Sequence, residues 1–254
     1  MQHSLHFVIE KLVKYSIIIP TVNEENLLPN LLKQLNDEKL KNKYEYEIII
    51  SDGGSTDNTI AVAGKFADKI LSKEDQKNQN IAAGRNVGAK SASGELLIFL
   101  NGDVIFNNVY KFFDYLENEF YKSNYLAFTC DVWIYPNEER LSDKLFHTIY
   151  NNYFCLLNYF GVGMGRGECQ VIRKNVFAKM GGYNENCAAG EDFELFKRIR
   201  KLGSILFSKK VFVYESPRRF RKLGYLNVTL SWIANSFSVI FFKKSLHSEW
   251  EQVR

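Results

Sequence analysis

The 254-residue sequence predicts an α/β fold, with a mostly parallel sheet covered by helices on both faces. Short apolar runs carry this prediction: YSIIIP at 15–20, EYEIIIS at 45–51 and ELLIFL at 95–100. Continuous apolar runs of this length are typical of strands buried on both faces of a parallel sheet. Segments with helical spacing of apolar residues lie between the runs, and this alternation indicates βαβ units. A chain of this length accommodates one large α/β domain, alone or with a short appendage.

The segments between these runs are expected to form three helices and one short strand. Residues 24–40 carry leucines at helical spacing, and residues 57–67 begin with Asp57, a residue type favoured as a helix N-cap. Residues 69–72 are predicted to form a short strand and residues 80–91 a helix. Ligands of such sheets bind beyond the carboxyl ends of the strands, which directs attention to the residues that follow each apolar run.

Beyond residue 104 the pattern of strands and helices is less regular. Helices are predicted over 107–123, 141–160 and 191–202, strands over 125–132, 169–173 and 211–215, and a flexible glycine-rich loop over 161–167. The sequence contains no repeat, low-complexity tract or linker that would split the chain. We therefore assign residues 1–222 to one domain and residues 223–254 to a C-terminal amphipathic helical appendage.

The C-terminal part combines a basic cluster, SPRRFRK at 216–222, with twenty uncharged residues at 223–242. A stretch of this length could cross a bilayer, but seven of its residues are Gly, Asn, Ser or Thr. The polar stripe favours a helix at a membrane interface or on a second subunit, ahead of a helix packed on the domain. Arg218 and Arg219 suit phosphate oxygens, either those of a bound diphosphate or those of an anionic lipid.

Composition and charge exclude several classes of protein. A net charge of +4, with 24% charged residues, is too small to predict nucleic-acid binding. The four cysteines have no CxxC spacing and are expected to be reduced thiols. Residues 1–14 contain Glu and Lys among their apolar residues, which argues against a signal peptide. We therefore expect a cytoplasmic protein, with peripheral contact to the cytoplasmic face of a membrane or self-association into a homo-oligomer.

Carboxylates follow two of the predicted strands. Asp52 comes directly after EYEIIIS and precedes two glycines, which allow a ligand to approach the backbone closely. Asp103 follows ELLIFL in the turn Asn101-Gly102-Asp103. One carboxylate together with substrate phosphates and water is the usual way in which Mg²⁺ or Mn²⁺ is held. Either aspartate alone would be an ordinary turn residue, but their shared position at one sheet edge favours a binding site.

Four segments resemble, in order, the inverting glycosyltransferases of family 2, which have the GT-A fold. They are SIIIPTVNEENLLPNLL, IIISDGGSTDNT, GRNVGAKSASGELLIFLNGD, and GRGECQVIRKNVFAKMGGYNEN followed by GEDFELFKRIRKLG. The resemblance runs over residues 15–201, and its second segment is the most specific. It implies a Rossmann-like nucleotide-binding fold that transfers a sugar, with inversion, from a nucleoside-diphosphate donor of UDP or GDP type. The implied acceptor is a glycan hydroxyl, or a lipid-linked or polyprenyl phosphate acceptor.

The resemblance also implies roles for individual residues. On the donor side, Pro20, Thr21, Glu24 and Asp52 would line the base and ribose pocket, Asn101 would accept a ribose hydrogen bond, Arg85 would approach the base or the diphosphate, and Asp103 would bind Mg²⁺ or Mn²⁺. On the acceptor side, Asp192 would be the general base, Glu191 would orient it or bind the acceptor, and Gly167 and Glu168 would lie near the acceptor. The family usually has Asp where this chain has Asn101, a neutral and weaker metal ligand.

These residue types suit the implied chemistry. A cation stabilises the charge that develops on a leaving diphosphate, and a positioned carboxylate takes the proton of the acceptor hydroxyl. One alternative is a sugar-nucleotide pyrophosphorylase, which would need a glycine-rich loop with Arg and Lys after the first strand, where PTVNEEN stands. Another is a non-catalytic, membrane-associated nucleotide-sugar binding module, which the retention of Asp103 and Asp192 disfavours. If Asp192 is not the base, Glu191, Asp131 and Glu168 are the next candidates.

Overall fold

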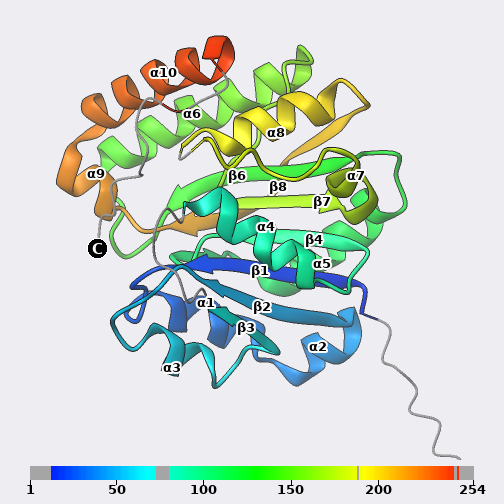
Figure 1. The fold of residues 1–254 in the computed structure, drawn as a ribbon. Coiled ribbons are helices and arrows are strands. Elements are labelled where there is room, and N and C mark those ends of the chain that lie inside the picture. Colours follow the sequence, from blue (N-terminus) through cyan, green and yellow to red (C-terminus); the bar gives the residue numbers. More distant parts are fainter. Residues whose placement is uncertain (1–12, 73–79, 188, 243–244, 246–254) are drawn as a thin grey trace, which may run out of the picture.

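The computed structural model describes residues 13–72, 80–187, 189–242 and 245 of the chain. Figure 1 shows one central sheet with helices on both faces, as the apolar runs predict. Residues 1–12, which make up most of the segment used to argue against a signal peptide, lie outside the described part. The predicted appendage beyond residue 242 also lies outside it, except for residue 245.

The described strands form one sheet in the order β3-β2-β1-β4-β7-β6-β8-β5. Their bounds are β1 Tyr15–Thr21, β2 Tyr46–Asp52, β3 Lys69–Ser72, β4 Leu96–Leu100, β5 Val104–Phe106, β6 Ala127–Ile134, β7 Cys169–Arg173 and β8 Ile205–Glu215. Strands β5 and β7 run antiparallel to their neighbours, and the remaining neighbouring pairs are parallel. The carboxyl ends of β1, β2, β4, β6 and β8 therefore meet at one edge, together with the start of β7.

Successive residues of a strand point to opposite faces of the sheet, and here both faces are buried. Ile17 and Ile19 of β1 belong to the core on one face, and Ile18 belongs to the core on the other. The first face is covered by α1 Leu28–Leu35, α2 Glu38–Tyr44, α3 Thr59–Ala63, α5 Val109–Tyr115 and the π-helix η1 Leu116–Tyr121. The second face is covered by α4 Ile81–Ser91, α7 Lys174–Lys179 and α8 Glu191–Arg200. Glycine lets α4 pack closely on the sheet, since a Cβ at Gly88 would collide with Ile18.

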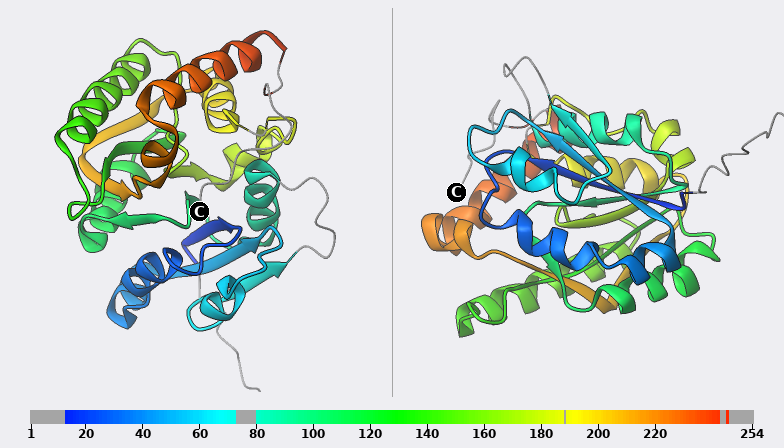
Figure 2. Two further views of the ribbon diagram at one scale, coloured as in Figure 1. Left: turned by 90° about the vertical axis from the view of Figure 1, so that its left-hand side faces the viewer. Right: turned by 90° about the horizontal axis from the view of Figure 1, so that it is seen from below.

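Three more helices, α6 Leu141–Tyr159, α9 Arg218–Leu223 and α10 Tyr225–Phe242, pack together beside the sheet (Figures 1 and 2). Phe220 and Val228 are buried with Ile134 in a small core of their own. An ion pair between Arg221 and Asp143 joins α9 to α6. Within the described ranges, no helix is long and apolar enough to cross a membrane.

The structure alters several predicted elements for local reasons. The helix predicted over 24–40 is two helices, because Asp37 caps α2 by accepting hydrogen bonds from the amides of Lys39 and Leu40 (2.8 and 3.2 Å). The helix predicted over 57–67 shortens to α3, and that over 107–123 divides into α5 and η1. The strand predicted over 211–215 begins at Ile205, and β5 and α7 add to the predicted elements.

Candidate active site

A cavity of about 1020 Å³ opens at the edge where β1, β2, β4 and β8 end. Side chains of α6 and α10, the loop before β7 and the start of α8 complete its walls. The predicted residues that line it are Pro20, Thr21, Glu24, Arg85, Asn101, Asp103, Gly167, Glu168, Glu191, Asp192, Arg218 and Arg219. Among the predicted site residues, Asp52 is the one that does not line the described cavity. The fold therefore brings the predicted donor and acceptor residues to one place.

Asp52 is buried and organises the turn after β2. Its Oδ2 accepts hydrogen bonds from the amides of Gly54 and Ser55 (2.9 and 2.8 Å). Its Oδ1 accepts from the hydroxyls of Thr21 and Ser55 (3.1 and 2.5 Å). These bonds fix the backbone around Gly53, which lines the cavity. Direct contact between Asp52 and a nucleotide stays a prediction.

Glu24, Asp103 and Arg218 form a charged group on the predicted donor side of the cavity. Arg218 binds Glu24 with both terminal nitrogens (Nη1–Oε2 3.0 Å, Nη2–Oε1 2.6 Å). Its Nη2 also lies 3.1 Å from Asp103 Oδ2. Burial raises the pKa of Asp103, Arg218 opposes that rise, and the charge of Glu24 adds to it. One guanidinium therefore serves two carboxylates that reach the cavity from different strand ends.

The carboxylates of this group fit a divalent cation. Mg²⁺ and Mn²⁺ are usually held by one or two carboxylates, with substrate phosphates and water as the other ligands. Asp103 and Glu24 supply two carboxylates in contact with one cationic side chain. No group of three or more His, Cys, Asp or Glu side chains in the described part of the chain forms a metal site by itself. Asn101 offers little to a cation, because its Oδ1 accepts a hydrogen bond from Arg85 Nη2 (3.0 Å).

Arg85 is wholly buried and joins the two sides of the site. Its Nη1 donates to Glu191 Oε1 (2.6 Å), and its Nη2 donates to Asn101 Oδ1 (3.0 Å) and to the carbonyl oxygen of Gly167 (2.7 Å). Removing one partner of such a buried pair leaves the other charge uncompensated, which is strongly destabilising. The geometry thus engages Arg85 with the acceptor-side carboxylate, and its approach to a base or diphosphate stays a prediction.

Glu191 and Asp192 begin α8 directly after Gly190, whose φ of 77° is a left-handed conformation that favours glycine. Glu191 is engaged by Arg85, whereas Asp192 Oδ1 accepts a hydrogen bond from the amide of the next residue (2.7 Å). A Cβ at Gly167 would lie only 3.2 Å from Asp192 Oδ2, so glycine at that position leaves the oxygen room for a ligand. Burial raises the pKa of Asp192, and Arg85 opposes the rise. A carboxylate with a raised pKa suits proton abstraction near neutral pH.

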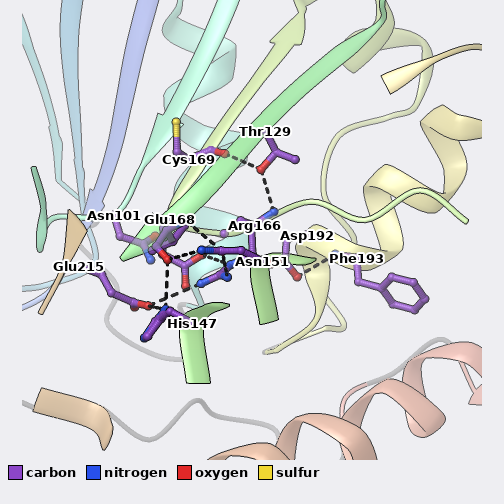
Figure 3. Close-up of polar contacts among 12 residues, drawn as sticks. Asn101, Thr129, His147, Asn151, Arg166, Glu168, Cys169, Asp192, Phe193 and Glu215 are labelled. Carbon is purple, nitrogen blue, oxygen red and sulfur yellow. Dashed lines mark hydrogen bonds and ion pairs between the residues drawn. The ribbon is translucent and has the colours of Figure 1, made fainter. Parts of the chain in front are cut away.

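Arg166 forms a buried charged cluster that the sequence did not reveal (Figure 3). Its Nε lies 3.2 Å from Glu168 Oε2, its Nη2 lies 3.5 Å from Glu215 Oε1, and its Nη1 donates to Asn151 Oδ1 (3.2 Å). Burial favours the neutral form of Glu168, but Arg166 outweighs it and lowers the pKa of that carboxyl. Glu168 is therefore held as a charged partner of Arg166, which disfavours it as a base. Glu215 ends β8, so the strand-end rule applied to 211–215 would have found it.

The glycine-rich loop over 161–167 packs closely on α8, a contact that its composition does not predict. A Cβ at Gly163 would lie 2.6 Å from Arg200 Cβ, and a Cβ at Gly165 would lie 2.6 Å from the ring of Phe196. Both glycines are therefore required by the close approach of the two backbones. The expectation of a flexible loop overlooked this packing, which depends on residues 31 and 37 positions further along the chain.

Helix α10 closes one side of the cavity. Asn235 Nδ2 donates to the carbonyl oxygen of Ala189 (2.8 Å), and Trp232 and Ile233 line the cavity. Val228 is buried on the inner side of the same helix. The inner side of α10 thus packs on the rest of the chain, the placement that the sequence favoured less than an interfacial helix.

Replacing Asp131 by asparagine is expected to stabilise the protein at neutral pH. Asp131 is buried in β6, does not line the cavity, and its Oδ1 has no hydrogen-bond partner among the described residues. Burial raises its pKa from 3.8 to about 6, although Lys209 and Arg166 oppose the rise. The folded state therefore binds this proton more tightly than the unfolded state does. The stability that the protonated Asp131 carboxyl contributes is fully present below pH 3.8 and is lost as the pH rises to about 6.

At pH 7 the Asp131→Asn variant should be more stable than the wild type by roughly 2–3 kcal/mol, because it has no charge to bury. The difference should vanish near pH 3.5, where the wild-type carboxyl is also neutral. Urea unfolding at both pH values measures the effect. A stability difference that does not change with pH would show that Asp131 is not the titrating group.

Comparison with known proteins gives a family and a distant relative in sequence. The model of the family described as "Glycosyl transferase family 2" matches residues 16–181. The poly(ribitol-phosphate) beta-N-acetylglucosaminyltransferase TarS of Staphylococcus aureus is 33% identical over 99 residues. The aligned part covers 38% of this chain and 17% of that protein, so the chain spans less than a fifth of the length of this curated relative.

Two solved structures have the same fold. The mannosyltransferase PcManGT from Pyrobaculum calidifontis, in complex with GDP-Man and Mn²⁺, is 15% identical with a TM-score of 0.61, covering 80% of this chain and 56% of that chain. The glucosyl-3-phosphoglycerate synthase from Mycobacterium tuberculosis, in complex with Mn²⁺, UDP-Glc and phosphoglyceric acid, is 15% identical with a TM-score of 0.62, covering 89% of this chain and 79% of that chain. These likenesses confirm the predicted α/β fold of GT-A type.

Proposed function

The chain belongs to glycosyl transferase family 2, and from this premise we propose that it transfers the sugar of a nucleoside-diphosphate sugar to an acceptor hydroxyl, with inversion at the anomeric carbon. One observation carries the proposal. Asp103, at the end of a buried parallel strand, and Asp192, at the start of α8, line the same cavity. A donor diphosphate near the first and an acceptor hydroxyl near the second would meet in that cavity.

The donor would lie over the ends of β1, β2 and β4. Pro20, Thr21 and Asn101 line this part of the cavity and would surround the nucleoside. Of the two similar structures, one holds GDP-Man and the other UDP-Glc, so both UDP and GDP donors stay open. Asp103, with Glu24, would hold Mg²⁺ or Mn²⁺, which when bound offsets the charge that develops on the leaving diphosphate.

Arg218 would change partners when the donor binds. Its guanidinium lies against Glu24 and Asp103. Guanidinium groups pair with phosphate oxygens in a bidentate manner, and Arg219 lines the cavity next to it. Arg218 would therefore leave Asp103 and bind the diphosphate. Its positive charge would then pair with phosphate oxygens, and the carboxylate of Asp103 would pair with the cation.

Asp192 would take the proton of the acceptor hydroxyl. Glu191 is less suited, because its Oε1 already accepts a hydrogen bond from the buried Arg85. A single base acting on the face opposite the leaving diphosphate gives in-line displacement, and therefore inversion. The acceptor is a glycan or a lipid-linked acceptor, which includes a polyprenyl phosphate. We place the protein on the cytoplasmic side, with peripheral membrane contact or self-association through the outer face of α6 and α10.

Thermal unfolding with UDP or GDP, each with and without Mn²⁺, tests the donor site. A nucleotide at one hundred times its Kd stabilises the native state by about 2.7 kcal/mol, which raises Tm by roughly 5–10 °C for a domain of this size. We expect one of the two nucleotides to give this shift and Mn²⁺ to increase it. Release of nucleoside diphosphate from a panel of sugar donors then reports the reaction.

The alternatives make different predictions in the same experiments. A non-catalytic binding module would show the shift in Tm but no release with any donor and acceptor. A sugar-nucleotide pyrophosphorylase would form nucleoside triphosphate from the sugar nucleotide and pyrophosphate. If neither UDP nor GDP raised Tm, the proposed function itself would be contradicted.

A further inference from the structure

Helix α6 turns apolar side chains toward solvent along its whole length, and α10 does so along its first half. On α6 these residues are Leu141, Leu145, Ile149, Tyr153, Leu156 and Tyr159, spaced three or four apart and 49–84% exposed. On α10 they are Leu226, Leu230 and Ile233, which are 72%, 55% and 49% exposed. The two helices lie side by side (Figure 1). A surface of this kind is far from the usual scattered exposure of single apolar residues and indicates an interaction site.

The apolar surface continues into the active-site cavity. Ile149 and Tyr153 of α6 and Ile233 of α10 are half exposed and also line that cavity. Between the helices, the ring of Tyr150 lies 5.3 Å from that of Trp232. These side chains define an apolar groove, which leads from the solvent-facing surface of α6 and α10 toward the start of α8.

The inner end of the apolar groove is chemically different from the rest. Phe193 and Asp192 line the cavity there, so the groove ends beside the carboxylate proposed as the base. Along the groove, Ile149 and Ile233 offer no hydrogen-bonding group, and α10 contains no charged residue. The polar residues of α10 in the lining, Thr229, Asn235 and Ser236, already donate to backbone carbonyl oxygens. A polar glycan would therefore lose its hydration along such a wall and receive few hydrogen bonds in return. A hydrocarbon chain would lose nothing and would gain the burial of its own surface.

We infer that the apolar groove between α6 and α10 binds the hydrocarbon tail of an amphiphilic acceptor, whose hydroxyl head lies at Asp192. This inference rests on the proposed function and selects the lipid-linked acceptor over the free glycan. A second copy of the chain would cover the outer residues such as Leu145 and Leu226. It would not explain why the apolar side chains continue inward to the proposed catalytic carboxylate.

Calorimetric titration with glucose and with butyl, hexyl and octyl β-glucoside, below their critical micelle concentrations, tests this inference. These probes share one sugar head and differ only in the length of the tail. Each buried methylene strengthens binding about fourfold, so octyl glucoside should bind on the order of two hundredfold more tightly than butyl glucoside. Ile149→Asn and Ile233→Asn, within the groove, should each weaken octyl glucoside binding about tenfold and leave butyl glucoside binding nearly unchanged.

Leu145→Asn and Leu226→Asn are the matched controls, because these residues lie on the same two helices, are exposed, and do not line the cavity. Both should bind octyl glucoside as the wild type does. An affinity that does not depend on tail length would overturn the inference, as would equal losses in groove and control variants. The inference would also be overturned if light scattering showed a wild-type dimer that the substitution Leu145→Asn dissociates, and if that dimer bound no alkyl glucoside. Nucleotide binding by the same samples separates these results from a failure of the proposed function, because only that failure would abolish the nucleotide-dependent rise in Tm.

Discussion

Asp192→Asn is expected to lower sugar transfer by about 10²–10⁴-fold while donor binding stays near that of the wild type, because a general base typically contributes that factor. Asparagine keeps the size of the side chain and the acceptor oxygen that receives the amide hydrogen of Phe193 (2.7 Å). It removes only the ability to take a proton. The loss should therefore appear in kcat, and donor affinity, measured by calorimetry, should be preserved.

Glu191→Gln is the matched control, since it removes the adjacent carboxylate of the same helix. Burial and the charge of Asp192 raise the pKa of Glu191, although Arg85 opposes the rise. Glutamine keeps a side-chain oxygen that can accept the hydrogen bond from Arg85 Nη1, and it carries no charge to bury, so the fold should tolerate the change. Transfer per folded molecule should fall much less than in Asp192→Asn. Near-normal transfer by Asp192→Asn, or a loss of donor affinity instead, would move the base to another residue and return Glu191 as the first candidate.

Asp103→Ala should weaken Mn²⁺-dependent binding of the nucleoside diphosphate by more than about 100-fold and leave the fold intact. Loss of a residue that only supports a metal ligand costs about 10–100-fold, and loss of the ligand itself should cost more. The fold should tolerate the change, because Arg218 keeps two hydrogen bonds to Glu24. Calorimetry with and without Mn²⁺, and electron paramagnetic resonance of bound Mn²⁺, measure the two parts of the effect.

Arg218→Met tests whether the guanidinium of Arg218 competes with a cation for the carboxylate of Asp103. This variant removes the guanidinium beside Asp103 and leaves both carboxylates in place. It should bind Mn²⁺ at least as well as the wild type when no nucleotide is present, and should bind the nucleoside diphosphate less tightly, because one phosphate ligand is lost. For the variant Asp103→Ala, Mn²⁺ and nucleotide binding as tight as in the wild type would show that Asp103 does not bind the metal.

The sequence by itself determined the architecture around the site. The runs at 15–20, 45–51 and 95–100 all proved to be buried strands, because an apolar run that fills both sides of a sheet has few other placements. Parallel strands bring their carboxyl ends to one edge, so the residues after each run had to gather there. Motif order then gave the family, and the boundaries of β7 follow those predicted from 169–173.

Only the tertiary structure decided how the gathered side chains pair. Asp52 looked like a nucleotide ligand in sequence, but its two oxygens are engaged by the local turn and by Thr21 of the neighbouring strand. Arg85 pairs with Glu191, and Arg218 pairs with Glu24, across 106 and 194 positions of the chain. Such pairs depend on which strands are neighbours, and no single strand carries that order in its own sequence.

The wall formed by α6 and α10 has the same origin. The sequence predicted a helix over 141–160 and an amphipathic helix over 223–242, and each of these is a property of its segment alone. Whether their apolar sides meet each other, a membrane or a ligand depends on the turn at Gly224, where a φ of 75° lets α10 fold back beside α6. Amphipathicity fixes which side of a helix is apolar, and only long-range packing fixes what that side faces.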